Sequence, residues 1–141
     1  MSATGRNAEA GATLLEMLVV VAIMTLVAGL TFPNVPRTLD RMSLSRTRAE
    51  LVTKLRMARA DAARRGRAVS LDIADDGRSY GWDQSEVALP AALRVEGETR
   101  SITFFADGSS SGGVLEVIGR RGALKVAVDP ITGVPAALGA G

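Results

Sequence analysis

Few side chains in this sequence of 141 residues could carry out catalysis, because it contains neither Cys nor His. Thiol nucleophiles, disulfides, imidazole bases and zinc sites with nitrogen or sulfur ligands are therefore excluded. The serines at 109–111 could attack a substrate only beside a base, and folding would have to bring Lys125 there. A serine hydrolase is the enzymatic alternative, whereas we expect a chain that is not an enzyme and binds no cofactor.

Two patterns that suggest ligand binding are better explained as turns. The glycines and serines of Asp107–Gly113 expose backbone N–H groups, as a phosphate cradle does, but the loop lacks the Lys and the following helix of a P-loop. Four aspartates could suggest calcium, yet their spacing matches no EF-hand loop and each stands in a turn signal. These are Asp75, Asp76, Asp107 and Asp129. We therefore expect no metal site.

The charge is unevenly distributed, although the net value is only +2. Segment 37–67 has ten basic residues against three acidic ones, and segment 68–141 has six against ten. The basic segment allows a nucleic-acid or anionic-lipid partner, but on a helix its Arg side chains would spread over a solvated face, which is the simpler interpretation. If DNA is the partner, the first residues to test are Arg46, Arg48, Arg120 and Arg121.

One segment, Ala12–Phe32, is apolar throughout except for Glu16. Its 21 residues would form a helix about 30 Å long, which matches the hydrocarbon core of a bilayer. We expect it to span a membrane; a buried helix of a soluble protein is the alternative. An isolated carboxylate there costs about 3 kcal/mol, so Glu16 should have a partner unless it snorkels to the nearby interface.

The apolar segment should be retained in the mature protein. A secretory signal is cleaved after its apolar stretch, whereas the only plausible processing position here, Gly11, precedes it. Further along, Pro33 has no N–H to donate to the carbonyl of Gly29, and Gly29 is itself a weak helix former. This pair predicts a kink or local melting of the helix, or alternatively its end.

The rest of the chain reads as one amphipathic helix followed by short strands. Five apolar residues at helical spacing predict a helix that packs on a sheet, and Gly66 is a natural stop. They are Leu44, Leu51, Leu55, Ala58 and Ala62. Alternation and turn signals predict strands near 69–73, 79–83, 93–95, 101–105, 114–118 and 124–128. The turn Asp129–Gly133 should lead to a final edge strand.

The junction that begins Gly11-Ala12 and reaches Glu16 resembles the class III leader site of type IV pilins and type II secretion pseudopilins. The resemblance implies that a prepilin peptidase cuts between Gly11 and Ala12 and methylates the new amino terminus. It also implies that Glu16 pairs with the amine of a neighbouring subunit during assembly, which is the partner that its burial requires. The family usually has Phe where this chain has Ala12, but the peptidase's main demand is the Gly.

The C-terminal half is similar to minor pseudopilins of the GspH/FimT type. The similarity rests on Phe104–Gly113, on the strand Val114–Ile118 and on Val128–Gly133, with Ala106 replacing a Pro often seen before the Asp-Gly pair. The implied fold is α+β and pilin-like, with a long N-terminal helix on an antiparallel sheet. The expected parts are a leader (1–11), a transmembrane and assembly helix (12–36), and a globular domain (37–141) made of an amphipathic helix (37–66) and a β-rich part (67–141).

The resemblance implies a structural subunit near the tip of a type II secretion pseudopilus. Its expected partners are other minor and major pseudopilins, the prepilin peptidase and an inner-membrane assembly platform. The alternative is a FimT-like minor pilin that binds DNA during uptake. We expect a single-pass inner-membrane protein with a cytoplasmic N-terminus and a periplasmic domain, although the positive-inside rule, applied to the arginines at 37–48, would place that domain in the cytoplasm.

Overall fold

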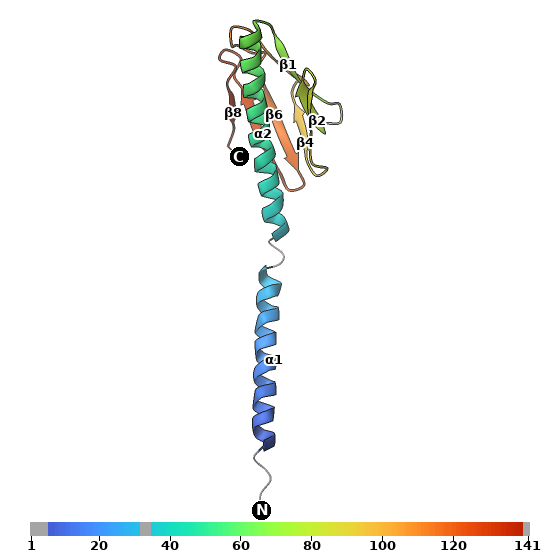
Figure 1. Ribbon diagram of the computed structural model, residues 1–141, viewed down its shortest axis with the longest axis vertical. Coiled ribbons are helices and arrows are strands. Elements are labelled where there is room, and N and C mark those ends of the chain that lie inside the picture. Colours follow the sequence, from blue (N-terminus) through green and yellow to red (C-terminus); the bar gives the residue numbers. More distant parts are fainter. Residues whose placement is uncertain (1–5, 32–34, 140–141) are drawn as a thin grey trace, which may run out of the picture. The chain divides into compact units, whose positions relative to one another are not determined.

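The computed structural model describes residues 6–31 and 35–139 (Figure 1). By its internal contacts the chain divides into two units, Met1–Thr38 and Leu39–Gly141. Each unit is described on its own below. The first holds the apolar helix, and the second holds all of the strands.

Helix α1, Arg6–Thr31, contains the apolar run. Its segment Thr13–Leu30 has a mean hydropathy of 2.4, and none of it is buried by the rest of the protein. Thr25, a polar residue within it, donates its hydroxyl to the carbonyls of Val21 and Ala22, so this group needs no water. The helix is thus long and apolar enough to cross a membrane.

Of the two residues that predict a kink, the structure describes only Gly29. Gly29 lies inside α1, and nothing stands within 4 Å of the position its Cβ would take. Pro33 lies outside the described residues. The kink therefore stays a prediction.

Helix α2, Val35–Arg65, begins and ends with ordinary helix signals. Pro36 stands in the first turn, where its missing N–H has no intrahelical partner to lose. Arg64 and Arg65 occupy the last turn, where cations favour the helix dipole. Gly66 follows with φ of 62°, and the Arg67 amide donates to the carbonyl of Ala62 at 3.3 Å, which closes a Schellman cap.

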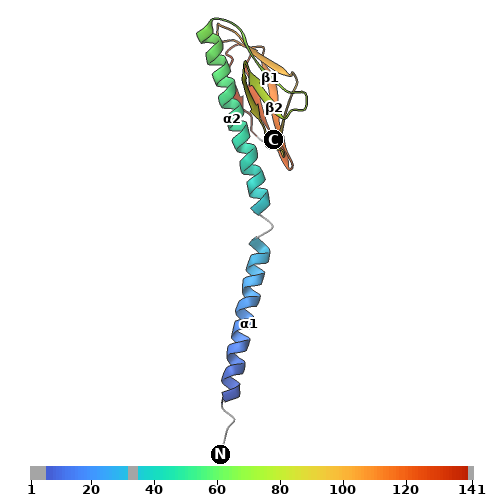
Figure 2. The ribbon, with the colours of Figure 1, turned by 45° about the vertical axis from the view of Figure 1, so that its right-hand side comes forward.

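The apolar stripe of α2 forms one wall of the core. All five predicted residues are buried, and Leu51, Leu55, Ala58 and Ala62 are completely inaccessible. Figure 2 shows α2 on one side of the globular unit and the strands on the other. The prediction that this stripe packs on a sheet is confirmed. The strands and Leu93, which immediately precedes β4, contribute the rest of the core: Val69, Leu71, Ile73, Tyr80, Leu93, Val95, Ile102, Phe104, Leu115, Val117, Val126 and Val128.

The strands form two antiparallel sheets of four. The first has the order β3-β2-β1-β5 and the second β4-β6-β7-β8. Their bounds are β1 Val69–Ile73, β2 Ser79–Trp82, β3 Ser85–Ala88, β4 Arg94–Gly97, β5 Ser101–Phe104, β6 Gly113–Gly119, β7 Gly122–Val128 and β8 Pro135–Ala137. The predicted α+β, pilin-like class is confirmed.

A hydrogen bond to the tight turn between β1 and β2 links the two sheets. The amide of Val95 in β4 donates to the carbonyl of Gly77, which follows β1, at 2.8 Å. Gly77 has φ of 67°, and a Cβ on it would lie 2.6 Å from the Val95 carbonyl oxygen. Only glycine fits both the backbone angle and this close approach.

The structure corrects several predicted boundaries. Strand β3 was not predicted, because Ser85–Ala88 is short, mostly exposed and without clear alternation. Helix α2 begins at Val35, slightly before the predicted start at residue 37. Strand β4 extends beyond the predicted 93–95 to Glu96 and Gly97, because pairing with β6 overrides their weak strand propensity. The final edge strand after Gly133 is confirmed as β8.

Candidate functional site

The predicted processing and assembly residues all lie in α1. The helix runs through Gly11, Ala12 and Glu16 without a break. Because Glu16 stands four residues after Ala12, the two share one helix face about 6 Å apart along the axis. The Glu16 side chain is exposed, and no partner for it occurs among the residues that the structure describes. The helix therefore presents a carboxylate one turn away from the amine that cleavage would create.

Three of the four candidate DNA-contacting arginines already have partners within the globular unit. Arg46 Nε lies 3.0 Å from Glu50 Oε1, with both side chains exposed. Arg48 donates to the carbonyl of Leu138 at 3.3 Å, and Arg121 Nε lies 3.9 Å from Asp40 Oδ2. Arg120 is exposed at the tip of the β6–β7 hairpin.

The serine- and glycine-rich loop uses its amides internally. Gly108 donates to Phe105, Ser109 to Asp107 Oδ1, Ser110 to Pro130, Ser111 to Thr103, and Gly112 to Ser110 Oγ. None of these five N–H groups is therefore left for a phosphate. Ser110 is buried and donates its hydroxyl to the Asp129 carbonyl at 3.0 Å, not to a base. The turn interpretation of this loop agrees with these bonds.

A second loop packs on the first and is held just as tightly. The carboxylate of Asp129 accepts the amides of Ile131 at 2.9 Å and Thr132 at 2.7 Å, and the Thr132 hydroxyl at 3.0 Å. These bonds, chiefly that from the Thr132 amide, lower the pKa of Asp129. Arg59 from α2 donates to the carbonyl of Gly108 at 3.1 Å. We call residues 105–112 and 129–134 together the loop end.

The four aspartates considered for calcium each have a separate local role. Asp75 pairs with Arg100, and Asp76 accepts the amide of Arg78 at 2.9 Å. Asp107 accepts the amide and hydroxyl of Ser109, which lowers its pKa. No group of three metal-ligating side chains occurs among the residues described.

An ion-pair network that the sequence analysis missed ties α2 to the β2–β3 hairpin. Asp61 is buried and pairs with Arg64 and, at 2.9 Å, with Arg65, which also reaches Asp83 at 3.1 Å. Burial raises the pKa of Asp61, but the bond from Arg64 and the charge of Arg65 outweigh it, so the pKa is lowered. The i+3 and i+4 spacing of both arginines was the available sequence signal.

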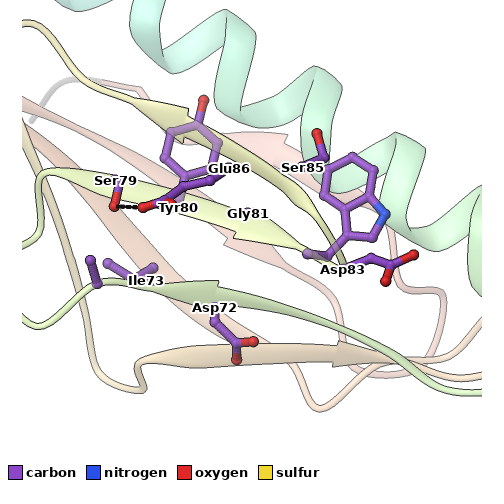
Figure 3. A pocket seen from close by; sticks show the side chains of 10 residues that line it. Asp72, Ile73, Ser79, Tyr80, Gly81, Asp83, Ser85 and Glu86 are labelled. Carbon is purple, nitrogen blue, oxygen red and sulfur yellow. Dashed lines mark hydrogen bonds between the residues drawn. The ribbon is translucent and has the colours of Figure 1, made fainter.

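The same hairpin borders a shallow pocket of about 270 Å³ (Figure 3). Its rim is acidic, with Asp72, Asp83 and Glu86, and Ser79 donates to Glu86 at 2.5 Å. In Figure 3 the Tyr80 hydroxyl points toward the helix. Burial, aided by the charge of Glu50, raises the pKa of Tyr80 to about 12. The tyrosine therefore stays neutral at physiological pH and serves the core.

Comparison with protein families identifies what this arrangement is. The prokaryotic N-terminal methylation motif matches residues 6–32, which include Gly11, Ala12 and Glu16. The family model of type II transport protein GspH matches residues 47–132, more than half of the chain. The chain belongs to the GspH family. It is a pilin-like minor pseudopilin, and its apolar helix with the methylation motif makes it a membrane-anchored protein that assembles with other pilins.

Solved structures share the fold of this GspH-family chain. The type IV minor pilin FimU of Pseudomonas aeruginosa has a TM-score of 0.62 and 17% identity, over 70% of this chain and 90% of that one. The minor pseudopilin EpsH from the type 2 secretion system of Vibrio cholerae has a TM-score of 0.57 and 14% identity, over 68% and 96%. No curated protein sequence matches the chain. At these identities the likeness shows the fold alone, and one relative comes from each system.

Proposed function

We propose that the chain is a minor pseudopilin of a type II secretion system, placed near the pseudopilus tip and supporting export across the outer membrane. The match of the GspH family model over 47–132 is the observation that carries this proposal. Its partners would be other minor and major pseudopilins, the prepilin peptidase and the inner-membrane assembly platform. The subunit acts by position and not by chemistry, in line with a family of non-enzymatic pilin-like subunits.

The proposed maturation begins at the N-terminus of α1. The peptidase cuts between Gly11 and Ala12 on the cytoplasmic side, and Ala12 becomes the methylated first residue. Thr13–Leu30 then stays in the inner membrane and the globular domain stays in the periplasm. This cut sets the boundary between the leader (1–11) and the membrane helix, which the globular domain follows.

Glu16 would set the register of assembly. Its carboxylate is exposed on the membrane helix, and a charge in hydrocarbon requires an opposite charge nearby. The amine of the neighbouring subunit's Ala12 supplies one and fixes the axial offset between the two helices.

Two variants test this assignment. Glu16→Ala should insert and lose its leader, yet be absent from the sheared pseudopilus fraction, because the pairing charge is missing. Gly11→Ala is the matched control, since it should remain at precursor mass and never reach assembly. Normal incorporation of Glu16→Ala would remove the assembly role, while a Gly11→Ala protein cut at the usual place would refute the cleavage site.

A gene deletion separates secretion from the alternative, a FimT-like pilin that binds DNA. Loss of exoproteins from the medium with normal transformation would support secretion. The reverse result would support DNA uptake, and Arg46, Arg48, Arg120 and Arg121 would then be the contacts to change. The exposed Arg120-Arg121 tip is the feature that keeps this alternative open.

A further inference from the structure

Arginines gather at the end of the globular unit where the chain enters it. The β6–β7 hairpin turns through Arg120 and Arg121, and this tip lies beside the first turns of α2. A hollow there is lined by Asp40, Arg41, Ser43, Leu44, Ala92, Leu93, Gly119, Arg120, Arg121 and Gly122. An adjoining hollow shares Arg120 with it and adds Arg78 and Arg94. All five arginines are exposed.

The local acids neutralise only part of this charge. Arg94 pairs with Glu96 at 2.7 Å, and Asp76 lines the second hollow. Asp40 lies 3.9 Å from Arg121, which is the outer limit of an ion pair. The guanidinium groups at the hairpin tip therefore keep most of their donors for an external partner.

Two apolar side chains are also exposed on the turns of α2 that carry Arg41, although neither lines the hollow. Leu39 is 60% exposed and Met42 is 65% exposed, three residues apart and thus on one helix face. Arg41 lies between them in sequence. Exposed apolar groups next to arginines are the composition of surfaces that lie in the headgroup region of a bilayer. We call Leu39, Arg41, Met42, Arg120 and Arg121 the entry surface.

The covalent chain holds the entry surface near a membrane. The apolar span ends at Leu30, and eight residues separate it from Leu39. Eight residues reach at most about 28 Å even when fully extended. Such a short tether gives the entry surface a high effective concentration at the bilayer.

We propose that the entry surface docks on the anionic phospholipid headgroups of the bilayer that holds the apolar helix. Arg120 and Arg121 bind headgroup phosphates, which match the planar donor fork of a guanidinium. Leu39 and Met42, exposed on the same turns of α2 as Arg41, enter the interface. The unassembled subunit thus rests on the membrane through its β6–β7 hairpin, and entry into a filament has to break this contact.

A membrane fits these residues better than nucleic acid does. A DNA backbone would use the arginines but would leave Leu39 and Met42 in water, whereas a bilayer uses both kinds of side chain. The proposal requires only that Thr13–Leu30 lies in a bilayer. It is therefore independent of leaflet and of the choice between secretion and DNA uptake.

The absence of cysteine allows a direct test with single labels on the full-length chain in nanodiscs. Gly122→Cys places a fluorophore at the hairpin tip, where a Cβ meets nothing within 4 Å. Ile131→Cys, at an 82% exposed residue of the loop end, is the matched control. A headgroup quencher should quench the Gly122→Cys label in discs with phosphatidylglycerol, more weakly in phosphatidylcholine alone, and the Ile131→Cys label in neither.

Charge variants identify the groups responsible. Arg120→Gln with Arg121→Gln should lower the ratio of docked to free tips roughly 25-fold, since each cation near an anionic surface contributes about five-fold. Arg56→Gln with Arg67→Gln removes two exposed charges elsewhere and should leave quenching unchanged. Unchanged Trp82 fluorescence would confirm that each variant is folded.

Three results would overturn the proposal. Equal quenching at both label sites would mean that the whole domain is near the bilayer without a specific surface. Equal quenching of the Gly122→Cys label in both lipids would show that the anionic headgroup is not the ligand. The same conclusion would follow if the Arg120/Arg121 variant were quenched as strongly as the unchanged chain. DNA that displaces the tip from anionic discs, and binds it in phosphatidylcholine discs through the same arginines, would assign the surface to nucleic acid.

Discussion

The two ends of the β6–β7 hairpin are built on different principles. At the loop end, two loops bind each other through backbone and side-chain hydrogen bonds, and Arg59 locks them to α2. At the entry surface, exposed arginines have one long ion pair at 3.9 Å and no comparable set of bonds. The hairpin therefore has hydrogen-bonded loops at one end and exposed arginines at the other.

The two ends should therefore serve different purposes: the loop end stabilises the fold, and the entry surface binds a partner. The loop end depends on backbone angles and close contacts, so even a small substitution there should weaken the fold. The entry surface adds little to the fold, so its side chains are free to serve a partner. Variants at the two ends should consequently fail in different assays.

The largest contrast should come from two glycines. Gly133 has φ of 63°, and its Cβ would lie 2.3 Å from the Gly108 carbonyl oxygen, whereas Gly122 has open space. Gly133→Ala should lower the free energy of unfolding by at least about 2 kcal/mol and the Tm by about 8 °C or more. Gly122→Ala should change it by less than about 0.5 kcal/mol. Trp82, the only Trp, reports unfolding of the full-length chain in detergent.

Equal losses of stability from both substitutions would show that the loop end and the hairpin tip are equally constrained. A neutral Gly133→Ala would mean that the loop around Gly108 yields at little cost.

Acid should weaken the hydrogen bonds of the loop end before it weakens the sheet. The Thr132 amide and hydroxyl lower the pKa of Asp129, and Ser109 lowers that of Asp107. A carboxyl with a folded pKa below its unfolded pKa of about 4 stabilises the fold fully above that value. This stabilisation is lost as the pH falls through the folded pKa. Hydrogen-exchange protection of the Ile131 and Thr132 amides should therefore fall once the pH drops below about 4, ahead of β6.

Thr132→Val provides the matched control. It removes the hydroxyl donor to Asp129 but leaves the amide donor, so the pKa of Asp129 should rise part of the way back and the acid sensitivity should shrink. A simultaneous loss of protection in the loop end and in β6 would contradict a separate role for these carboxylates.

Periodicity allowed much of the fold to be predicted. The stripe from Leu44 to Ala62 is buried as expected, because burial of a helix face requires apolar residues at that spacing. Strand β3 was missed because an exposed edge strand needs no alternation; its place depends on pairing with β2.

The sites were predictable to different degrees. Gly11, Ala12 and Glu16 form a contiguous motif, so sequence alone indicates them, and their roles remain predictions. The entry surface could not be predicted, because Arg41 and Arg121 are 80 positions apart and meet only through the hairpin register. The network around Asp61 was equally hard to predict, because Arg65 reaches Asp83 of the β2–β3 hairpin only in the folded chain.

The smallest effect on stability should come from the residues with the largest expected effect on membrane docking. Arg121→Gln removes one partner of an exposed, 3.9 Å ion pair with Asp40. Exposed pairs of this kind contribute about 0–1 kcal/mol, so the free energy of unfolding should change by less than about 0.5 kcal/mol, and the Tm by about 2 °C. Thermal unfolding followed by Trp82 fluorescence measures it. A loss as large as that of Gly133→Ala would mean that the arginine holds the hairpin in place, and its effect on docking would then reflect a damaged fold.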